Sequence, residues 1–220
     1  MNHCVMIKRL AGAIGVVILL SGTLTACVGP LLVGGAMVGG SLVAIDRRTS
    51  GAQLDDEAIE LRAANHINSS LGTRVRASVT SYNRQVLLTG EVPNLQDKQR
   101  VEQVVKAVDS VASVVNELAV LNTPSFMDRS ADTVLTGRVK ALLLDAMGMK
   151  SNAFTVVSER GTVYLMGRVT QREAEQATEV VRSMSGVQKV VRLLEIISEQ
   201  ELERLGMEPA RTQPAARPAL

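Results

Sequence analysis

The hydrophobic positions of this chain form four stretches with helical spacing, separated by shorter runs typical of β-strands. The helical stretches cover Asp55–Leu71, Leu95–Val108, Ser130–Met149 and Gln171–Met184. The strand-like runs are Val75–Tyr82, Gln85–Val92, Val111–Val120, Phe154–Glu159, Thr162–Val169 and Val187–Ile197. Asn83–Arg84 and Arg160–Gly161 separate paired runs and are the expected turns. In chain order, the pattern predicts α-β-β-α-β followed by a second α-β-β-α-β.

The second half of this pattern repeats the first. Val86–Val92 matches Val163–Val169 at an offset of 77 residues, and the helical stretches match at an offset of 76. The one-residue changes fall where loops are expected. Two copies of one module follow, in residues 54–122 and 130–197, each predicted to have a three-stranded mixed sheet with two helices on one face. The fold class is therefore α+β, and two such small modules gain stability if they pack together.

The start of the chain carries the three-part pattern of a secretory signal. Two basic residues precede the apolar run Leu10–Leu20, which is too short to span a bilayer. Leu24–Cys27 resembles the bacterial lipobox, which implies removal of residues 1–26 and lipid modification of Cys27. A plain signal peptide is the alternative. Val28 stands where an aspartate would retain a lipoprotein at the inner membrane, so export to the outer membrane is favoured.

Little regular structure is expected at either end of the processed chain. Residues 27–53 begin with an apolar, glycine-rich stretch, interpreted as a membrane-hugging tether because each glycine costs roughly 1 kcal/mol in a helix. A short interfacial helix and a second membrane segment are the alternatives. Residues 198–220 are charged and then rich in proline and alanine, which predicts a short helix followed by a disordered tail.

Composition narrows the class of function. Aromatic residues make up 2% of the chain and tryptophan is absent, which argues against base-stacking nucleic-acid binding and aromatic sugar clefts. The net charge of +2 comes from the signal segment, so the processed chain has no excess of either sign. Two cysteines and two histidines leave little for disulfides, metals or acid–base chemistry. Nucleophile, metalloprotease and phosphate-loop motifs do not occur. We therefore expect no enzyme activity, cofactor, metal site or nucleic-acid partner.

The few distinctive small and polar residues have structural interpretations. Helical phase places His66 near the buried side of its helix. Asp55–Glu57 come at a predicted helix start, where carboxylates offset the macrodipole. Gly90 and Gly167 end matching strands, where a missing Cβ permits a bulge or a close approach of a helix. We predict that both glycines serve the fold and bind no ligand.

The helix that begins near Ser130 has two apolar faces. A projection at 100° per residue assigns to the core Leu135, Val139, Leu142, Leu143 and Ala146. The opposite, solvent-facing side carries Val134, Gly137, Ala141, Leu144 and Gly148, with Arg138 and Lys140 beside it and Met147, Met149 and Lys150 near the helix end. An outward apolar ridge with basic flanks is typical of a surface that meets an anionic membrane. Packing against the first module or another protein explains it equally well.

The order of elements and a Gly–x–Val triplet in each copy resemble the BON domain, a module of the bacterial envelope. The matching segments are Gly90–Val92, Gly167–Val169, Val111–Asn116 and Val187–Val191. The lipobox, the glycine-rich stretch, Asp46–Asp56 and Tyr164–Ala174 extend the likeness. Over roughly residues 24–197, the chain is similar to the dual-BON outer-membrane lipoproteins known as division- and outer-membrane stress-associated lipid-binding proteins.

This resemblance implies that the first helix of the second module binds anionic phospholipids, such as phosphatidylglycerol and cardiolipin. The candidate lipid-binding residues are Val134, Gly137, Arg138, Lys140, Ala141, Leu144, Met147 and Gly148. Val134 stands where a family member has a tryptophan, and keeps an apolar contact of smaller area. The resemblance also implies an acyl anchor in the outer membrane facing the periplasm, enrichment at the division site, and a role in envelope integrity and division. An adaptor for the outer-membrane assembly machinery is the alternative function.

Overall fold

The computed structural model describes residues 46–121 and 126–205, which belong to one compact unit, Val43–Leu220. The order α-β-β-α-β occurs twice within it, so the predicted α+β fold with two tandem modules is confirmed. The expected signal peptide, Cys27, most of the tether and the tail beyond residue 205 lie outside the described residues.

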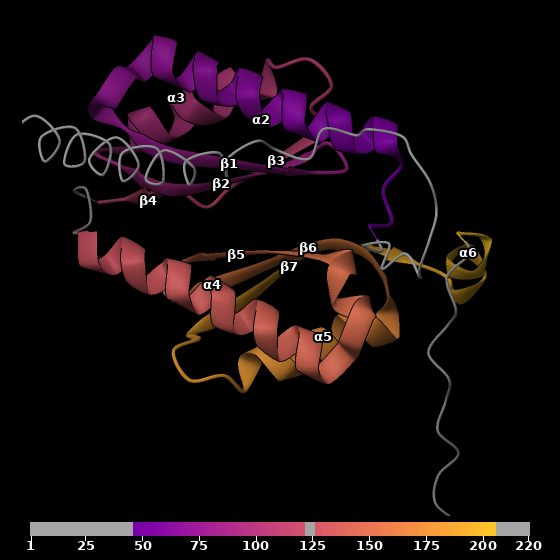
Figure 1. The fold of residues 1–220 in the computed structure, drawn as a ribbon. Helices are drawn as coiled ribbons and strands as arrows, with labels where there is room; N and C mark the ends of the chain where they lie inside the picture. The colour runs from indigo at the N-terminus through magenta and orange to yellow at the C-terminus, as the bar shows by residue number, and fades with distance from the viewer. Residues whose placement is uncertain (1–45, 122–125, 206–220) are drawn as a thin grey trace, which may run out of the picture. The chain divides into compact units, whose positions relative to one another are not determined.

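The first module is built around a central strand, β2 (Figure 1). Its elements are α2 (Ser50–Leu71), η1 (Gly72–Arg74, a 3-10 turn), β1 (Arg76–Tyr82), β2 (Gln85–Val92), α3 (Leu95–Lys106), β3 (Ser113–Asn116) and β4 (Ala119–Val120). β2 pairs antiparallel with β1 and parallel with both β3 and β4, which keep one register along it. β3 and β4 are therefore two parts of the last predicted strand. The strand is interrupted next to Leu118, which is 1% exposed and packs in the core.

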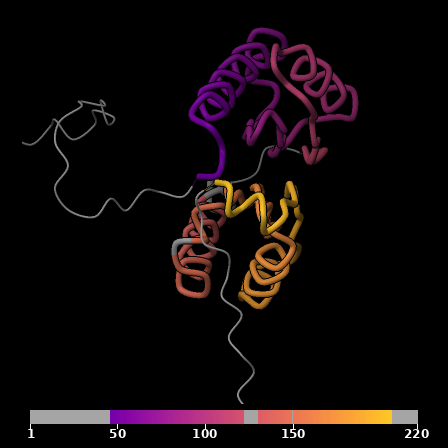
Figure 2. Tube along the Cα trace, turned by 90° about the vertical axis from the view of Figure 1, so that its right-hand side faces the viewer, coloured from indigo at the N-terminus to yellow at the C-terminus, as the bar shows by residue number. Residues whose placement is uncertain are grey.

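The second module repeats this plan. Its elements are α4 (Phe126–Met147), η2 (Gly148–Ala153), β5 (Phe154–Glu159), β6 (Thr162–Thr170), α5 (Gln171–Arg182) and β7 (Lys189–Ile197), followed by the short helix α6 (Glu199–Arg204). β6 is central, antiparallel to β5 and parallel to β7. In each module the two long helices cover one face of the sheet (Figures 1 and 2), as the sequence predicts.

Each module has its own aliphatic core between its helices and its sheet. In the first module the core includes Ile59, Ala63, Leu88, Val101 and Val105, and in the second Val139, Leu143, Leu165, Ala177 and Val181. All ten side chains are at most 1% exposed. Apolar burial of this kind is the main favourable term in folding. Both cores lie within the compact unit Val43–Leu220.

A third buried cluster joins the two sheets on the faces that carry no helices. It consists of Tyr82 and Leu87 from the first module and Tyr164 and Met166 from the second, all at most 5% exposed. Side chains alternate between the two faces of a strand, so Leu87 points away from the core that holds its neighbours. β2 and β6 are therefore buried on both faces, and the two modules share one interior.

The hairpin turns lie where the sequence predicts them. Asn83 and Arg84 have φ angles of 49° and 68°, and Arg160 and Gly161 have φ angles of 51° and 71°. Two successive positive φ angles are those of a type I′ turn, whose twist matches that of the flanking strands. Each two-residue turn therefore sets the register of its hairpin.

A carboxylate from the first helix of each module holds its turn in place. Asp56 is 2% exposed and accepts hydrogen bonds from the amides of Asn83 and Arg84 at 2.7 and 2.8 Å. Asp132 accepts hydrogen bonds from the two amides of the β5–β6 turn at 2.9 and 3.3 Å. α2 begins at Ser50, so Asp56 lies beyond its first turn. The interpretation of Asp56 as a partner of the helix macrodipole is therefore wrong.

Gly90 and Gly167 occupy places where a neighbouring backbone carbonyl comes too close for a side chain. A Cβ at Gly90 would collide with the carbonyl oxygen of Arg76, and one at Gly167 with that of Ala153. Gly90 also has a φ of 115°, which side chains disfavour. Gly90 permits the close approach of β1 to β2, and Gly167 permits the close approach of the last residue of η2 to β6, whereas the sequence suggested a bulge or the approach of a helix.

Two further features of α2 differ from the sequence prediction. The helix begins five residues earlier than expected, because Thr49 caps it by accepting a hydrogen bond from the Ala52 amide at 3.1 Å. His66 is exposed, whereas helical phase placed it near the buried side. The buried line of this helix passes through Ala63 and Ile67, and His66 is rotated away from it by about 100°.

Candidate functional site

α4 presents to solvent the side that the sequence singled out. Val134 and Leu144 are each 52% exposed. The exposed residues, which we call the α4 ridge, are Val134, Gly137, Arg138, Lys140, Ala141, Leu144 and Gly148. This exposure excludes packing of the ridge against the first module, which the sequence had left open. The ridge is an apolar strip with two cations and is free to meet another surface.

Met147 does not belong to the α4 ridge, although it was a candidate lipid-binding residue. It is 8% exposed and packs in the core of the second module. Leu135, Val139 and Leu143 are also buried, and successive steps of four residues along a helix stay close to one side. The same step leads from Leu143 to Met147, so this methionine continues the core side.

The structure also places an anion beside the ridge. Asp145 is exposed and follows Arg138 by seven residues, which is two helical turns and therefore the same side of α4. Asp145 lies outside the pattern of apolar and basic positions from which this face is predicted. A charge inventory of the helical projection would have found it. Among the residues of α4 whose side chains the structure describes, the exposed side carries two cations, Arg138 and Lys140, and one anion, Asp145.

α2, the equivalent helix of the first module, has a different exposed side. Leu54 and Leu61 are each 66% exposed, so this helix also shows apolar residues to solvent. Here the negative charges are in excess, because Asp55, Glu57 and Arg62 are all exposed. An anionic surface would therefore be attracted to α4 more than to α2.

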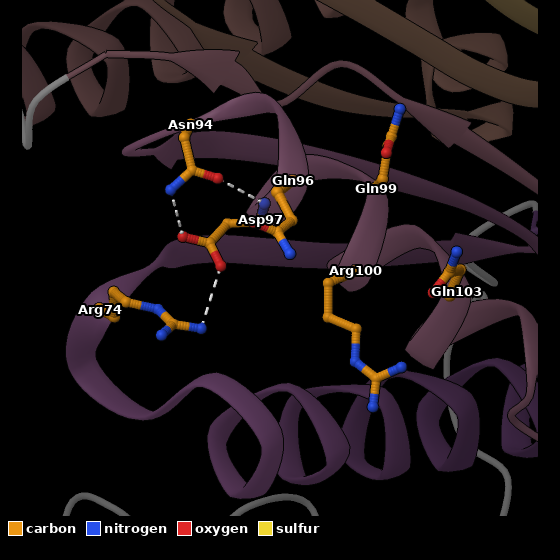
Figure 3. A pocket seen from close by; sticks show the side chains of 7 residues that line it. All are labelled: Arg74, Asn94, Gln96, Asp97, Gln99, Arg100 and Gln103. Atoms are coloured by element: carbon orange, nitrogen blue, oxygen red, sulfur yellow. Dashed lines mark hydrogen bonds and ion pairs between the residues drawn. The ribbon is translucent and has the colours of Figure 1, made fainter.

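A polar hollow of about 640 Å³ lies on the first module between η1 and α3 (Figure 3). Asp97 is engaged there by Arg74 at 3.0 Å and by the side-chain amide of Asn94 at 2.9 Å. Arg100 also lines the hollow and is exposed. The other lining side chains are those of Gln96, Gln99 and Gln103. This amide-rich surface carries no apolar wall and differs in chemistry from the α4 ridge.

The segment that precedes α2 is attached to the second module by a buried ion pair. Arg47 is 3% exposed and donates two hydrogen bonds to the Glu173 carboxylate, at 2.6 and 2.8 Å, and one to the Arg168 carbonyl at 3.0 Å. Burial alone would raise the pKa of Glu173, but the hydrogen bonds from Arg47 and the Thr170 amide outweigh it and lower the pKa. Glu173 is thus held as a carboxylate at the start of α5.

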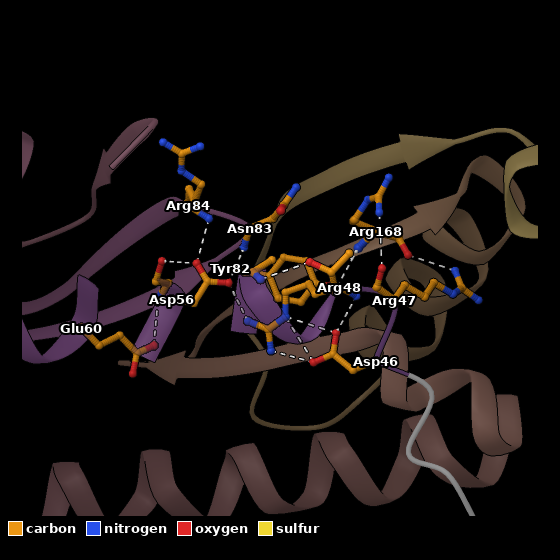
Figure 4. A network of polar contacts seen from close by, with 12 residues as sticks. Asp46, Arg47, Arg48, Asp56, Glu60, Tyr82, Asn83, Arg84 and Arg168 are labelled. Atoms are coloured by element: carbon orange, nitrogen blue, oxygen red, sulfur yellow. Dashed lines mark hydrogen bonds and ion pairs between the residues drawn. The ribbon is translucent and has the colours of Figure 1, made fainter. Parts of the chain in front are cut away.

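The next residue, Arg48, attaches the same segment to the first module. Its guanidinium donates to Asp56 at 2.7 Å and to Asp46, and it lies 4.4 Å from the ring centre of Tyr82 (Figure 4). The hydroxyl of Tyr82 accepts a hydrogen bond from the Arg168 amide of the second module at 3.2 Å. Adjacent arginines therefore attach one short segment to both modules.

A second polar cluster crosses between the modules around Arg76. This arginine on β1 forms ion pairs with Glu91 on β2 and with Glu159 on β5. Burial raises the pKa of Glu159; Arg76 opposes this shift, and the neighbouring Glu91 carboxylate adds to it. Two carboxylates thus share one cation, with Glu91 buried and Arg76 and Glu159 partly exposed. The ion pairs of Arg76 join residues from three different strands, and no sequence motif connects these residues with a function.

Within residues 46–121 and 126–205, no set of three histidine, cysteine, aspartate or glutamate side chains is arranged to hold a metal ion. The helices of the same residues include none that combines the length and the apolar character needed to cross a bilayer. Among the described residues, the α4 ridge combines exposed apolar side chains with an excess of positive charge, whereas the exposed side of α2 has an excess of negative charge.

Comparison with known proteins places both modules in one family. The BON domain family matches residues 55–122 and 131–198. The outer membrane lipoprotein DolP of Haemophilus influenzae is 36% identical over 193 residues, covering 87% of this chain and 97% of that protein. The 21 kDa hemolysin of Actinobacillus pleuropneumoniae is 29% identical over 155 residues, covering 70% of this chain and 80% of that protein.

A solved structure with a weaker likeness is the C-terminal domain of CdsD, a structural protein of the type III secretion system of Chlamydia trachomatis. It is 13% identical and covers 61% of this chain and 96% of that domain, with a TM-score of 0.28, which is too low to support an argument. The family match and the relative from Haemophilus influenzae suffice: the chain belongs to the dual BON-domain proteins of the DolP type.

Proposed function

We propose that this chain is an outer-membrane lipoprotein whose α4 ridge binds anionic phospholipid. The observation that carries the proposal is the ridge itself, with half-exposed Val134 and Leu144 next to the exposed cations Arg138 and Lys140. The name of the relative from Haemophilus influenzae supports the outer-membrane location. The two BON modules and the DolP-type relative point to a binding protein and away from an enzyme.

The strength of this contact can be worked out from the exposed residues. Full burial of an apolar side chain contributes about 1.5–3 kcal/mol, and each basic residue near an anionic membrane about 1 kcal/mol. Two half-exposed apolar residues and two cations, less the repulsion of Asp145, give about 2.5–4 kcal/mol. This corresponds to a dissociation constant near the millimolar range. The ridge alone would bind weakly and reversibly.

An acyl anchor on Cys27 would make such weak binding effective. Tethering converts the contact into an intramolecular one, with an effective lipid concentration that a free protein does not experience. The proposed arrangement is therefore two-part, with the anchor holding the protein at the periplasmic side of the outer membrane and the α4 ridge selecting anionic lipid. Enrichment at the division site and support of envelope integrity and division would follow from where anionic lipid gathers.

The test is a lipid titration with residues 43–220, which lack the expected anchor. Vesicles containing phosphatidylglycerol or cardiolipin are pelleted at millimolar lipid, and the bound protein is measured. Arg138→Glu should weaken binding about 30-fold, because it reverses one charge at the membrane. Leu144→Asp should weaken it to a similar extent, about 30-fold, since it removes a half-buried apolar contact and adds a negative charge.

Matched controls come from the other module. Leu61→Asp and Arg62→Glu change the same residue types on the exposed side of α2, and both variants should bind like the unmodified protein. Binding should also fall steeply as salt rises from about 0.05 to 0.5 M. Equal binding by all five proteins, or binding that ignores salt, would rule out the ridge as the lipid surface and favour the alternative role as an adaptor for outer-membrane assembly proteins.

A further inference from the structure

The two modules meet through polar contacts at two ends, with the apolar cluster that joins the sheets between them. Strand β1 runs from Arg76 to Tyr82, and each of these residues belongs to one end. Tyr82 lies at the end where its hydroxyl accepts a hydrogen bond from the Arg168 amide. Arg76 lies about 20 Å away along the strand, where it meets Glu91 and Glu159. We call Glu91 and Glu159 the carboxyl pair.

The carboxyl pair has one cation for two acids. The Nε atom of Arg76 donates a hydrogen bond to Glu91, and its Nη2 atom donates one to Glu159. Glu91 is buried, and Glu159 shows only 14% of its side chain to solvent. If both carboxyl groups are ionised, this end of the interface holds one negative charge in excess, away from bulk water. Such a charge is costly unless it is neutralised.

The carboxyl pair also lacks a hydrogen-bond donor. The Oε1 atom of Glu91 is buried, and among the described residues it has no hydrogen-bond partner. Burial raises the pKa of Glu159, Arg76 opposes this shift, and Glu91 adds to it by its charge and by a hydrogen bond between the two side chains. That bond needs a proton on one carboxyl group, because two carboxylates are both acceptors. One shared proton would therefore remove the excess charge and satisfy the buried oxygen.

The other ionisable groups around the carboxyl pair do not replace this proton. They line the hollows next to Glu91 and Glu159, and are Lys98, Glu117, Asp132, Arg138, Arg160, Tyr164 and Lys189. Arg138, Arg160 and Lys189 are exposed, so solvent screens their charges. Asp132 accepts hydrogen bonds from the β5–β6 turn, and Lys98 acts on the Glu102 carboxylate. Burial raises the pKa of Tyr164 to about 12, so its hydroxyl stays neutral and donates to Glu117.

We propose that Glu91 and Glu159 form a proton-dependent latch between the two modules. With one proton shared, the pair bridges β2 and β5 and holds this end of the interface closed. Without the proton, two ionised carboxylates repel each other, water enters between them and this end opens. The opposite end keeps the buried bonds of Arg47 to the second module, so the modules move as about a hinge. The latch concerns the position of the modules, whichever surface binds lipid.

The direction and the size of the movement follow from the proton. Because the pKa of Glu159 is raised, the stabilising contact is complete below the ordinary glutamate pKa and is lost as the pH rises through the folded value. A hydrogen bond between a carboxyl group and a carboxylate spans about 2.5–2.7 Å. A bridging water needs two bonds of about 2.7–2.8 Å. Opening should therefore separate the modules by about 3 Å at this end.

The experiment is a measurement of distances between spin labels, for which residues 43–220 are suited because they contain no cysteine. At the latch end, Thr73→Cys in η1 and Ser185→Cys in the loop before β7 are exposed positions on different modules. At the opposite end, Ser113→Cys on β3 and Gln171→Cys on α5 serve as the reference. From about pH 4 to about pH 8, the first distance should lengthen by about 3 Å and the second should stay constant.

Two substitutions identify the group that responds. Glu159→Gln offers an amide donor to Glu91 without a charge, so the first distance should stay short at every pH. Glu117→Gln is the matched control, because it makes the same change in a hollow that Glu159 also lines, and it should keep the response. Lengthening at the latch end alone, abolished by Glu159→Gln and kept by Glu117→Gln, would support the latch.

Four results would overturn the latch. The first is a constant distance between labels at Thr73 and Ser185 in the otherwise unmodified protein. The second is lengthening that persists with Glu159→Gln, and the third is lengthening that disappears with Glu117→Gln. The fourth is an equal change of both label pairs, because a hinge at the Tyr82 end requires that end to stay closed.

Discussion

The buried pair of Arg47 and Glu173 allows a sharp test of how the modules are held. Arg47→Met keeps much of the side-chain volume but removes both hydrogen bonds to the Glu173 carboxylate and the one to the Arg168 carbonyl. Glu173 is 2% exposed, so it would remain as a buried carboxylate that keeps only the donor from the Thr170 amide. Breaking a buried ion pair from one side costs about 3–5 kcal/mol.

For a unit of this size, that cost should lower the melting temperature by about 6–20 °C. The assay is thermal unfolding of residues 43–220 at pH 7, followed by circular dichroism. Arg74→Met is the control, because Arg74 forms its ion pair with Asp97 at the surface, with 59% of its side chain exposed. An exposed pair contributes about 1 kcal/mol or less. A drop for Arg47→Met no larger than that of Arg74→Met would refute the reasoning.

The pH dependence gives an independent check. The folded pKa of Glu173 is lowered, so its contribution to stability is present above the ordinary glutamate pKa and is lost as the pH falls through the folded value. Without Arg47, burial would raise this pKa instead. The stability difference between Arg47→Met and the unmodified protein should therefore shrink between pH 7 and about pH 4. A difference that stays constant over this range would contradict a charged Glu173.

Four further substitutions have expected outcomes in the same unfolding assay. Asp56→Ala removes the acceptor that holds the first hairpin turn and should cost about 3 kcal/mol or more of stability at pH 7. Because its hydrogen bonds lower the pKa of Asp56, the difference in stability between this variant and the unmodified protein should fall on acidification. Gly90→Ala should destabilise by about 2 kcal/mol or more through collision with the Arg76 carbonyl, whereas Gly137→Ala, with open space around the new methyl group, should stabilise by about 0.5–1 kcal/mol. Glu159→Gln should stabilise the protein near neutral pH. The pKa of Glu159 is raised in the folded protein, so its ionisation costs stability as the pH rises through the folded pKa, and glutamine removes this cost. The gain should vanish below the ordinary glutamate pKa, and a loss of stability at pH 7 would contradict the reasoning.

Much of the fold could be predicted because the sequence contains the module twice. Because the two copies align at a nearly constant offset, each strand and helix of the module is predicted from two different stretches of sequence. Both two-residue turns were found at Asn83–Arg84 and Arg160–Gly161, where the chain must leave one strand-like run and begin the next. The exposed ridge around Val134 and Leu144 followed from helical phase alone.

The remaining features depend on contacts that local patterns do not contain. Arg47 and Glu173 are 126 residues apart, and no spacing rule connects them. Asp56 serves a turn that follows it by 27 residues, so its carboxylate was interpreted from its own helix only. Met147 lies at the end of α4, where small errors in helical phase accumulate and decide between core and surface. The lipid-binding assignments remain predictions, since they concern a partner and not the fold.

The attachment of residues 46–48 has a mechanical consequence. A pull on the chain from the N-terminal side of Asp46 would reach the bidentate bonds between Arg47 and Glu173, and then Arg48 and Asp56, before it reached the first turn of α2. The load would be divided between the two modules at the point of entry. Force would therefore not act on α2 alone and separate the modules. An anchored protein with this attachment would transmit tension to both modules together.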